Sequence, residues 1–354
     1  MKNILYIFVI NLFAISCNKN PIPNEVKGKE KKFTYIQNIQ LSETSDSIFI
    51  QYTKMQIGFA KNELPLKSAM VVPTSVIAYM DALDISNKIT GISQVNYVFN
   101  PKVQEEFKNR ELEEIGTFNE IFIEKVLVQK PDIFIAQSGP TLAKYYEILQ
   151  NEGIKIVFID EYEEFHPLAK AEYLKIIGIL FGKEKESEKL FSEIESNYLK
   201  IKEKVNSENQ EKPQILSNHI YGDIWYMPGG ESFQSILFQD AGGDYLWADT
   251  DNKFTLHLSF ESVFEKAATA DFWMNAGDFS SISEMVASYK NYEWFSALKN
   301  KQVYNWSKRS SPTGANDYFE TGVVRPDWVL TDLASIFYPN LFPEHELFFY
   351  TKLE

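Results

Sequence analysis

The sequence predicts an α/β protein with two lobes, each built on a parallel sheet, joined by a single long α-helix. Three observations support this prediction. Residues 183–206 are rich in Glu, Lys, Leu and Ile and contain neither Pro nor Gly, as in a long helix. Short apolar strands alternate with helical patterns on both sides of this segment, as in parallel sheets. A short sequence motif recurs in both halves: a Glu at the start of a predicted helix, followed by an Asp directly before a predicted strand.

The long helix is predicted from the spacing of its apolar residues. They lie three and four positions apart and form one stripe, made of Leu190, Phe191, Ile194, Tyr198, Ile201 and Val205. At about 1.5 Å per residue the segment is roughly 35 Å long, the width of a domain. A polar run and Pro213 follow it. We therefore predict an N-terminal lobe over 33–182, a connecting helix over 183–207 and a C-terminal lobe over 208–354. The alternative is one more amphipathic helix within a single domain.

Residues 1–17 are typical of an export signal. Lys2 precedes an apolar run over 4–15 that is too short for a membrane span, and small residues lead into Cys17, the only cysteine. This pattern is similar to a bacterial lipobox, in which the cysteine is lipidated. The polar residues 18–32 are predicted to be a flexible tether. We expect a protein anchored to the membrane through Cys17 on the periplasmic side of the cell envelope; a plain secretory signal is the alternative.

Composition excludes several classes of protein. With 354 residues, 44% of them apolar, the chain is long enough for two cores and too apolar to be disordered. Its net charge of −14 argues against a nucleic-acid partner, which would require a basic face.

The N-terminal lobe is predicted to contain strands at 69–72, 89–92, 133–136 and 155–159, and helices at 76–83, 121–130, 141–151 and 168–181. Residues 33–53 have the alternation of a β-hairpin at the edge of the lobe. In parallel sheets ligands bind at the carboxyl ends of the strands. The loops at these ends are therefore expected to line a binding site, and they carry Thr74, Ser75, Tyr97, Ser138 and Tyr162. The acidic pair Glu163 and Glu164 is interpreted as solvated surface.

The C-terminal lobe is predicted to contain strands at 214–220, 270–274 and 302–305, and helices at 233–241, 260–266 and 326–337. Residues 221–230, 275–279 and 306–322 are predicted loops. Large aromatic residues in or beside these loops suit a bulky ring-bearing ligand, although they could instead pack the lobe interface: Trp225, Tyr226, Trp306 and Tyr318. Asn275 lies in a strand-end loop, and Arg309 could meet an anionic group of the ligand.

The repeated motif consists of residues 124–126 and 130–135 in the first lobe and of residues 261–263 and 269–274 in the second. With the lipobox and the single connecting helix, it resembles the substrate-binding lipoproteins of ABC importers for cobalamin and ferric siderophores. The resemblance covers roughly residues 68–333 and is most specific over residues 123–132. It implies two Rossmann-like lobes of the class III periplasmic binding protein type, with the ligand in a cleft between them.

The resemblance also implies partners. In that family one Glu on each lobe docks to arginines of the permease, and the matching positions are Glu124 and Glu261. A Glu in the first turn of a helix is also common because the helix dipole favours it. The residues Tyr318, Phe319 and Glu320 resemble an aromatic and Glu pair that the family places at the cleft. The loop over 309–320 is longer than usual, which leaves the ligand's identity open. We expect a monomer that works with an ABC permease and its ATPase.

Other functions are less well supported by the sequence. A bare-metal receptor would need clustered ligands, whereas the four histidines are scattered at His166, His219, His257 and His345. Residues 229–233 lack the last Gly of a nucleophile elbow, and no HExxH or P-loop occurs. We therefore expect no catalysis, no resident cofactor and no metal site, and a ferric siderophore or cobalamin as the captured chelate. Haem, a bare metal and an envelope hydrolase are the alternatives.

Overall fold

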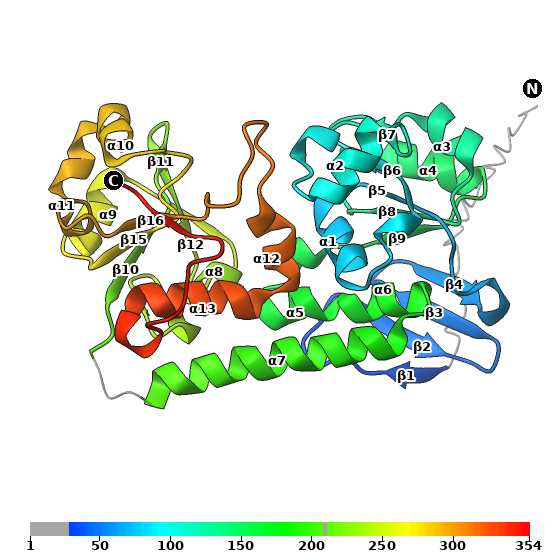
Figure 1. The fold of residues 1–354 in the computed structure, drawn as a ribbon, viewed down its shortest axis with the longest axis horizontal. Helices are drawn as coiled ribbons and strands as arrows, with labels where there is room; N and C mark the ends of the chain where they lie inside the picture. The colour runs from blue at the N-terminus through cyan, green and yellow to red at the C-terminus, as the bar shows by residue number, and fades with distance from the viewer. Residues whose placement is uncertain (1–27, 208–210) are drawn as a thin grey trace, which may run out of the picture.

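The computed structural model describes residues 28–207 and 211–354 (Figure 1). The predicted signal, Cys17 and most of the predicted tether lie outside the described residues. Residues 29–31, which we expected to belong to the tether, form strand β1 (Lys29–Lys31). Within the described ranges, no helix has both the length and the apolar composition needed to cross a bilayer.

An antiparallel sheet precedes the first α/β lobe. It consists of β1 followed by β2 (Gln40–Glu43), β3 (Ser47–Gln51) and β4 (Gln56–Ala60), paired in that order. The predicted hairpin over 33–53 is therefore the middle of a four-stranded sheet. Leu41, Ile50 and Phe59 are buried, because alternate residues of these strands face the lobe.

The N-terminal lobe is built on five parallel strands in the order β7-β6-β5-β8-β9. Their bounds are β5 (Ala69–Val71), β6 (Ile89–Ser93), β7 (Glu113–Gly116), β8 (Ile133–Ala136) and β9 (Ile156–Phe158). The helices between them are α1 (Thr74–Ala82), α2 (Pro101–Lys108), α3 (Ile123–Gln129), α4 (Ala143–Asn151), α5 (Pro167–Glu172) and α6 (Leu174–Leu180). The strand order reverses between β5 and β8, and in open α/β sheets such a switch point is where ligands bind.

The C-terminal lobe repeats this plan. Its sheet has the order β13-β10-β15-β16-β17, parallel except for β17. The strands are β10 (Gln214–Ser217), β13 (Asp244–Tyr245), β15 (Phe272–Met274), β16 (Val303–Asn305) and β17 (Thr351–Lys352). The helices are α8 (Phe233–Asp240), α9 (Phe260–Ala267), α10 (Ile282–Ser288), α11 (Ser296–Lys299), α12 (Thr321–Val324) and α13 (Pro326–Phe337).

The prediction of a loop over 221–230 is wrong. Strands β11 (Ile220–Tyr221) and β12 (Ile224–Pro228) occupy most of it and pair with β14 (Thr255–Leu258) in a small antiparallel sheet. The predicted strand at 214–220 is shorter, because the chain turns at Asn218, which has a φ of 58°. The two lobes and their parallel sheets nevertheless confirm the predicted fold class.

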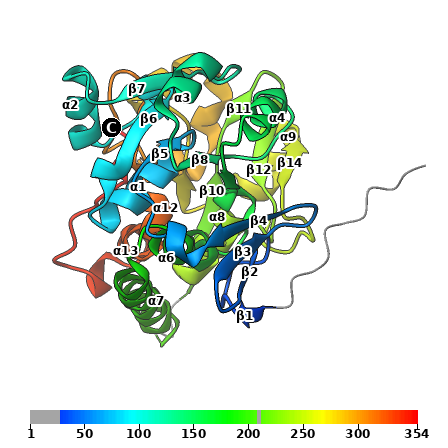
Figure 2. The same cartoon turned by 90° about the vertical axis from the view of Figure 1, so that its right-hand side faces the viewer.

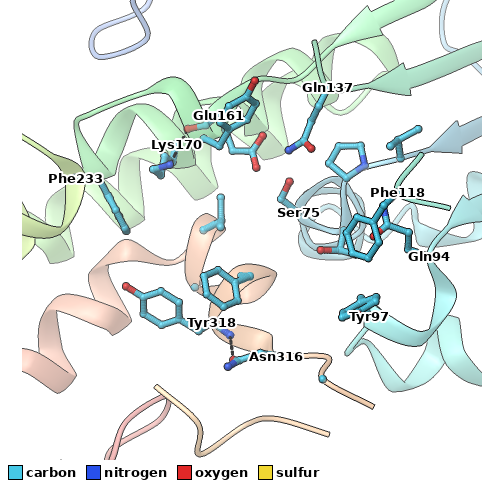
Figure 3. A pocket seen from close by; sticks show the side chains of 18 of the residues that line it. Ser75, Gln94, Tyr97, Phe118, Gln137, Glu161, Lys170, Phe233, Asn316 and Tyr318 are labelled. Atoms are coloured by element: carbon cyan, nitrogen blue, oxygen red, sulfur yellow. Dashed lines mark hydrogen bonds between the residues drawn. The ribbon is translucent and has the colours of Figure 1, made fainter. Parts of the chain in front are cut away.

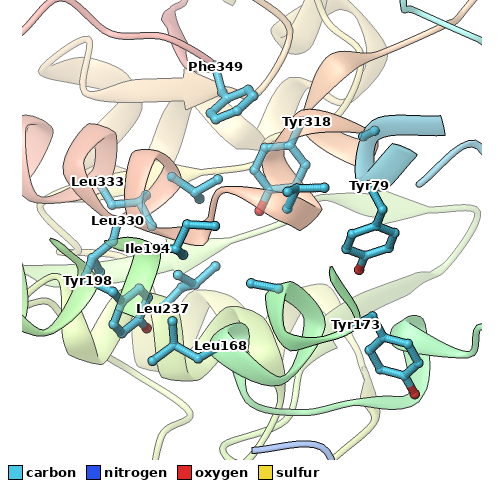
Figure 4. Close-up of a cluster of buried hydrophobic side chains, with 14 of the residues drawn as sticks. Tyr79, Leu168, Tyr173, Ile194, Tyr198, Leu237, Tyr318, Leu330, Leu333 and Phe349 are labelled. Carbon is cyan, nitrogen blue, oxygen red and sulfur yellow. The ribbon is translucent and has the colours of Figure 1, made fainter. Parts of the chain in front are cut away.

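Helix α7 (Glu184–Ser207) runs beneath both lobes and lies against α6 of one lobe and α13 of the other (Figures 1 and 2). The predicted apolar stripe is the face that it buries. Ile194 and Tyr198 lie in one cluster with Leu237 of α8 and with Leu330 and Leu333 of α13 (Figure 4). The Tyr198 hydroxyl donates to Asp240 Oδ2 over 2.8 Å. The helix therefore holds the two lobes through a shared core.

The segment 306–322, predicted as a loop, also joins the lobes. It contains a 3-10 turn (Asp317–Phe319) and leads into α12, which packs against α1 and α5. Glu320 is buried and accepts hydrogen bonds from the backbone amides of Phe99 at 2.5 Å and Asn100 at 3.1 Å. The Thr313 hydroxyl donates to the Asn96 carbonyl over 2.8 Å. The C-terminal lobe thus contacts the start of α2 in the N-terminal lobe.

Two buried carboxylates attach the terminal segments to the lobes. Glu172 on α5 accepts from three consecutive backbone amides, those of Thr34, Tyr35 and Ile36. Asp332 on α13 accepts from three more, those of Phe348, Phe349 and Tyr350, and lies 2.7 Å from His345 Nε2. Each carboxylate satisfies backbone donors that would otherwise be left without a partner in the interior.

Replacing Asp332 by Asn should lower the free energy of unfolding by about 2 kcal/mol. The amide keeps one acceptor oxygen and places an NH2 group against backbone donors. Urea unfolding followed by circular dichroism measures the change. Glu344→Gln, on the exposed turn nearby, is the matched control and should stay within about 0.5 kcal/mol of the parent. Equal stability of the two variants would contradict the assigned role.

Glu320 should make stability depend on pH. Burial raises the pKa of Glu320 to about 8, although its two backbone hydrogen bonds act in the opposite direction. Between about pH 5 and pH 8 the folded chain keeps a proton that the unfolded chain has lost, so stability falls as the pH rises, by up to about 1.4 kcal/mol per unit. Glu320→Gln should lack this contribution. The measurement is the difference in unfolding free energy between parent and variant across this range, and a constant difference would contradict it.

Candidate functional site

A cleft lies between the two lobes. It consists of two adjoining cavities of about 450 Å³ and about 620 Å³, which share the side chains of Tyr162, Lys170, Phe233 and Gln234. The N-terminal lobe contributes residues 72–75, directly after β5, and Gln137, directly after β8. These segments flank the switch point of the sheet. The fold therefore places the cleft where parallel α/β sheets bind their ligands.

Aromatic rings from both lobes line the cleft. Several of the exposed large apolar side chains of the described residues gather here, namely Tyr97, Phe118, Tyr162, Phe254 and Phe319. Figure 3 shows Phe118 and Tyr97 on one side of the cavity, with Tyr318 and Phe233 on the other. Exposed aromatic surface of this kind is costly in water and marks a binding site for an apolar or ring-bearing partner.

A buried polar group lies at one end of the cleft. Glu161 and Lys170 are 4% and 8% exposed, and the Lys170 ammonium donates to the Glu161 carbonyl over 2.8 Å. It also lies 4.8 Å from the centre of the Phe233 ring. Burial raises the pKa of the Glu161 carboxyl and lowers that of the Lys170 ammonium. This end of the cleft is therefore both charged and poorly solvated.

Two polar atoms at this end have no hydrogen-bond partner within the part of the chain that the structure describes. They are the Ser75 hydroxyl and Glu161 Oε2, and both side chains border the same cavity (Figure 3). A buried polar atom without a partner costs about 1–3 kcal/mol. A ligand that brings a hydrogen-bond donor to this end would recover that free energy. The cleft thus combines aromatic walls with a small number of polar groups, as small-molecule sites do.

The structure brings five of the predicted site residues into this cleft. All five line its smaller cavity: Thr74, Ser75, Tyr97, Tyr162 and Tyr318. Trp306 lies behind them, half-buried, with its ring stacked on Tyr318 at 4.8 Å between centroids. Ser138 lies on a neighbouring cavity, and its carbonyl accepts from the Tyr162 hydroxyl over 3.3 Å.

The prediction that Trp225 lines the cleft is wrong. Its side chain is fully buried in the C-terminal lobe and stacks on Trp273 with 5.4 Å between ring centroids. Trp225 belongs to β12, where side chains alternate between the two faces, and it faces the core. Its neighbour Tyr226 faces the other way and contacts His257 on β14, and it does not border either cavity of the cleft.

Asn275 and Arg309 are engaged within the protein. Asn275 is 3% exposed, and its Oδ1 accepts from the Tyr350 hydroxyl over 3.1 Å. Arg309 Nε donates to Asp317 Oδ2 over 2.6 Å, and the guanidinium lies against the rings of Phe99 and Phe348. Arg309 therefore supports the segment 306–322 that crosses between the lobes.

Sequence reasoning missed several residues of the site: Gln94, Phe118, Gln137, Glu161, Lys170 and Phe233. Glu161 follows the predicted strand 155–159. Its position in a strand-end loop could therefore have indicated that it lines the site. The surface interpretation of Glu164 is wrong, because this residue is 3% exposed and accepts from the backbone amides of Gln37 and Asn38. Contacts with the N-terminal segment, distant in sequence, bury it.

His166 does not reach the cleft as a ligand. Its Nδ1 accepts from the Leu168 amide over 3.1 Å and caps α5, and its ring stacks on Tyr35. Within residues 28–207 and 211–354, no three side chains of His, Cys, Asp or Glu converge in a way that could hold a metal ion.

Glu124 and Glu261 occupy corresponding places on the two lobes. Each is exposed and lies in the first turn of its helix, α3 and α9. Both helices lie on the side of the molecule away from α7 (Figures 1 and 2). One partner surface could therefore reach both carboxylates, and their part in docking stays a prediction.

Known proteins share this architecture. The chain is similar to an uncharacterized lipoprotein of Methanocaldococcus jannaschii, with 26% identity across 99% of this chain and 85% of the relative. A possible iron-binding, periplasmic solute-binding protein from Staphylococcus epidermidis has a similar structure, with a TM-score of 0.61, 19% identity, and coverage of 77% of this chain and 99% of that one.

A second solved structure is that of an ABC-type Fe3+-hydroxamate transport system from Saccharomonospora viridis. It has a TM-score of 0.59 at 16% identity and covers 82% of this chain and 98% of that one. At such identities these two structures support the fold alone. Residues 71–310, more than half of the sequence, match the model of the periplasmic binding proteins. The chain belongs to this family of periplasmic binding proteins.

Proposed function

We propose that this protein captures a metal chelate between its lobes and delivers it to the permease of an ABC importer. The observation that carries the proposal is the cleft, which is lined by aromatic rings from both lobes and lies at the carboxyl ends of their strands. Members of the family bind solutes and are not enzymes, which agrees with the expected absence of catalysis.

The class of ligand follows from the cleft's chemistry and from its relatives. Wide aromatic walls suit a bulky organic chelate better than a bare ion, which needs converging polar ligands. Of the proteins with a similar fold, one is described as a possible iron-binding protein and another as an Fe3+-hydroxamate transport system. A ferric siderophore is therefore the first candidate, and cobalamin and haem are the alternatives for the same experiment.

Anchoring and delivery complete the proposal. Lipidation of Cys17 would hold the protein at the membrane, and the similarity to an archaeal lipoprotein supports this placement. Glu124 and Glu261 would contact basic residues of the permease, one from each lobe. Their exposure and their common side of the molecule support this arrangement.

Titration of tryptophan fluorescence tests the ligand class. Trp306 stacks on Tyr318 at the cleft, so a bound chelate should quench its emission. We expect saturable quenching by one member of a panel of ferric siderophores, cobalamin and haemin, after correction for absorbance. Phe118→Ala should weaken that binding about tenfold, because an aromatic wall is lost. Leu199→Ala, on the exposed face of α7, is the control and should bind as the parent does. If no compound of the panel quenched the fluorescence, the result would contradict the proposal.

Charge reversal at both Glu124 and Glu261 should abolish uptake of the chelate by cells and leave its affinity for the purified protein unchanged. The reason is that both carboxylates are exposed and lie outside the residues that line the cleft. Uptake of radioactive iron in the chelate and the fluorescence titration supply the two readouts. Reversal of Glu344 is the control for a general change in charge. Lost affinity would instead place these residues in the binding site.

A further inference from the structure

A second pocket lies outside the cleft, between the N-terminal antiparallel sheet and the first lobe. Its volume is about 610 Å³. One wall is the turn between β3 and β4, residues 52–55, and the other is α4. Phe158 and Asp160, at the end of β9, close its base. The sheet that supplies the first wall lies outside residues 71–310, the range that matches the family model.

The pocket is built on a rigid aromatic frame. The Tyr52 hydroxyl donates to the Phe158 carbonyl over 3.1 Å and accepts from the Phe158 amide over 3.0 Å, which attaches the sheet to β9. The ring of Phe158 packs edge-on against Tyr52 and Tyr146, with centroids 6.0 Å and 5.5 Å away. Met55 and Ile39 extend the apolar wall. These surfaces can cover the body of a small apolar or aromatic molecule.

An unsatisfied hydroxyl points to a ligand. Tyr146 lines this pocket and is only 4% exposed, yet its hydroxyl has no hydrogen-bond partner among the described residues. Such groups are rare in native interiors and call for an explanation. Asp160, 8% exposed, also lines the pocket, and its carboxylate accepts a hydrogen bond from the Ser138 amide over 2.6 Å. Burial raises the pKa of both groups, and the charge of Asp160 contributes to the shift of Tyr146.

Charge selects the kind of group that fits. Three carboxylates line the pocket, those of Glu147, Asp160 and Glu163, against one ammonium, that of Lys54. An anion would be repelled, and a neutral group would leave the buried carboxylate without a counter-charge. A primary ammonium carries three hydrogen-bond donors and no acceptor, so it can donate to the Asp160 carboxylate and to the Tyr146 oxygen at the same time. A quaternary ammonium has no donor and could not.

We propose that this pocket is a second binding site, separate from the chelate cleft, for a small primary amine with an apolar or aromatic body. The ammonium lies between Asp160 and Tyr146, and the body packs on Phe158, Met55 and Tyr52. Because Ser138 and Glu163 also border the region of Tyr162, the site adjoins the cleft. The proposal does not depend on which chelate the cleft binds.

Isothermal titration calorimetry of the full chain with phenethylammonium tests the proposal. We expect phenethylammonium to bind at one site per chain. The neutral 2-phenylethanol should bind about tenfold more weakly than this amine, and the anion 3-phenylpropionate should not bind. Phenethyltrimethylammonium should bind about fivefold more weakly than phenethylammonium, because its quaternary nitrogen has no N–H to donate. Equal affinity for the amine and the alcohol, or no binding of the amine at millimolar concentration, would overturn the proposal.

Variants locate the site. Tyr146→Phe should weaken binding of the amine about fivefold without lowering the melting temperature, because the lost hydroxyl makes no hydrogen bond to any described residue. Asp160→Asn should weaken it about tenfold. Tyr221→Phe, at the end of β11, and Asp223→Asn, on the turn that follows, change exposed residues; they are the matched controls and should bind as the parent does. If Phe118→Ala abolishes binding and Tyr146→Phe does not, the amine occupies the chelate cleft and the proposal fails.

Discussion

The packing of α7 against both lobes is the constraint on which the rest of the structure depends. One stripe of this helix is buried by α6 on one side and by α13 on the other, and Ile194 and Tyr198 lie in a cluster shared with the C-terminal lobe (Figure 4). A helix that is fully packed along its length resists bending, because its backbone hydrogen bonds and its core contacts would break together. The lobes can therefore close on a ligand only by small movements.

This constraint gives the cleft its shape. Both sheets point the carboxyl ends of their parallel strands toward the space above α7, so the loops after β5 and β8 face the segment 306–322 of the other lobe (Figure 1). That segment reaches across and buries Glu320 against the start of α2. The unsatisfied Ser75 and Glu161 atoms lie inside this enclosure. Protein interiors rarely keep such groups unless a site requires them.

The N-terminal antiparallel sheet is attached to the first lobe by its own set of contacts. Its attachment rests on long-range polar contacts, in which Glu172 receives the amides of residues 34–36 and Tyr52 binds the edge strand β9. Covering β9 removes an exposed edge that could pair with another chain. The same contact creates the acidic pocket around Asp160. One structural element thus both protects the sheet and forms a second candidate site.

The sequence by itself determined the features that depend on local periodicity. The stripe of α7, the helix at 326–337 and the strand after Asp132 could be predicted because each is a regular repeat of apolar residues over a few turns or alternations. Placing Thr74, Ser75 and Tyr97 at the cleft followed from the geometry of parallel sheets. The family resemblance, carried mainly by residues 123–132, added the expectation that the ligand lies in a cleft between the two lobes.

Only the tertiary structure decided which polar and aromatic residues face the cleft. Trp225 looked like a loop aromatic, yet pairing of β12 with β14 turned it into the core. Glu164 looked like a surface charge, yet it is buried against the backbone amides of Gln37 and Asn38. Contacts between segments more than a hundred residues apart set the burial of Glu164 and Glu320, and no short stretch of sequence records such contacts.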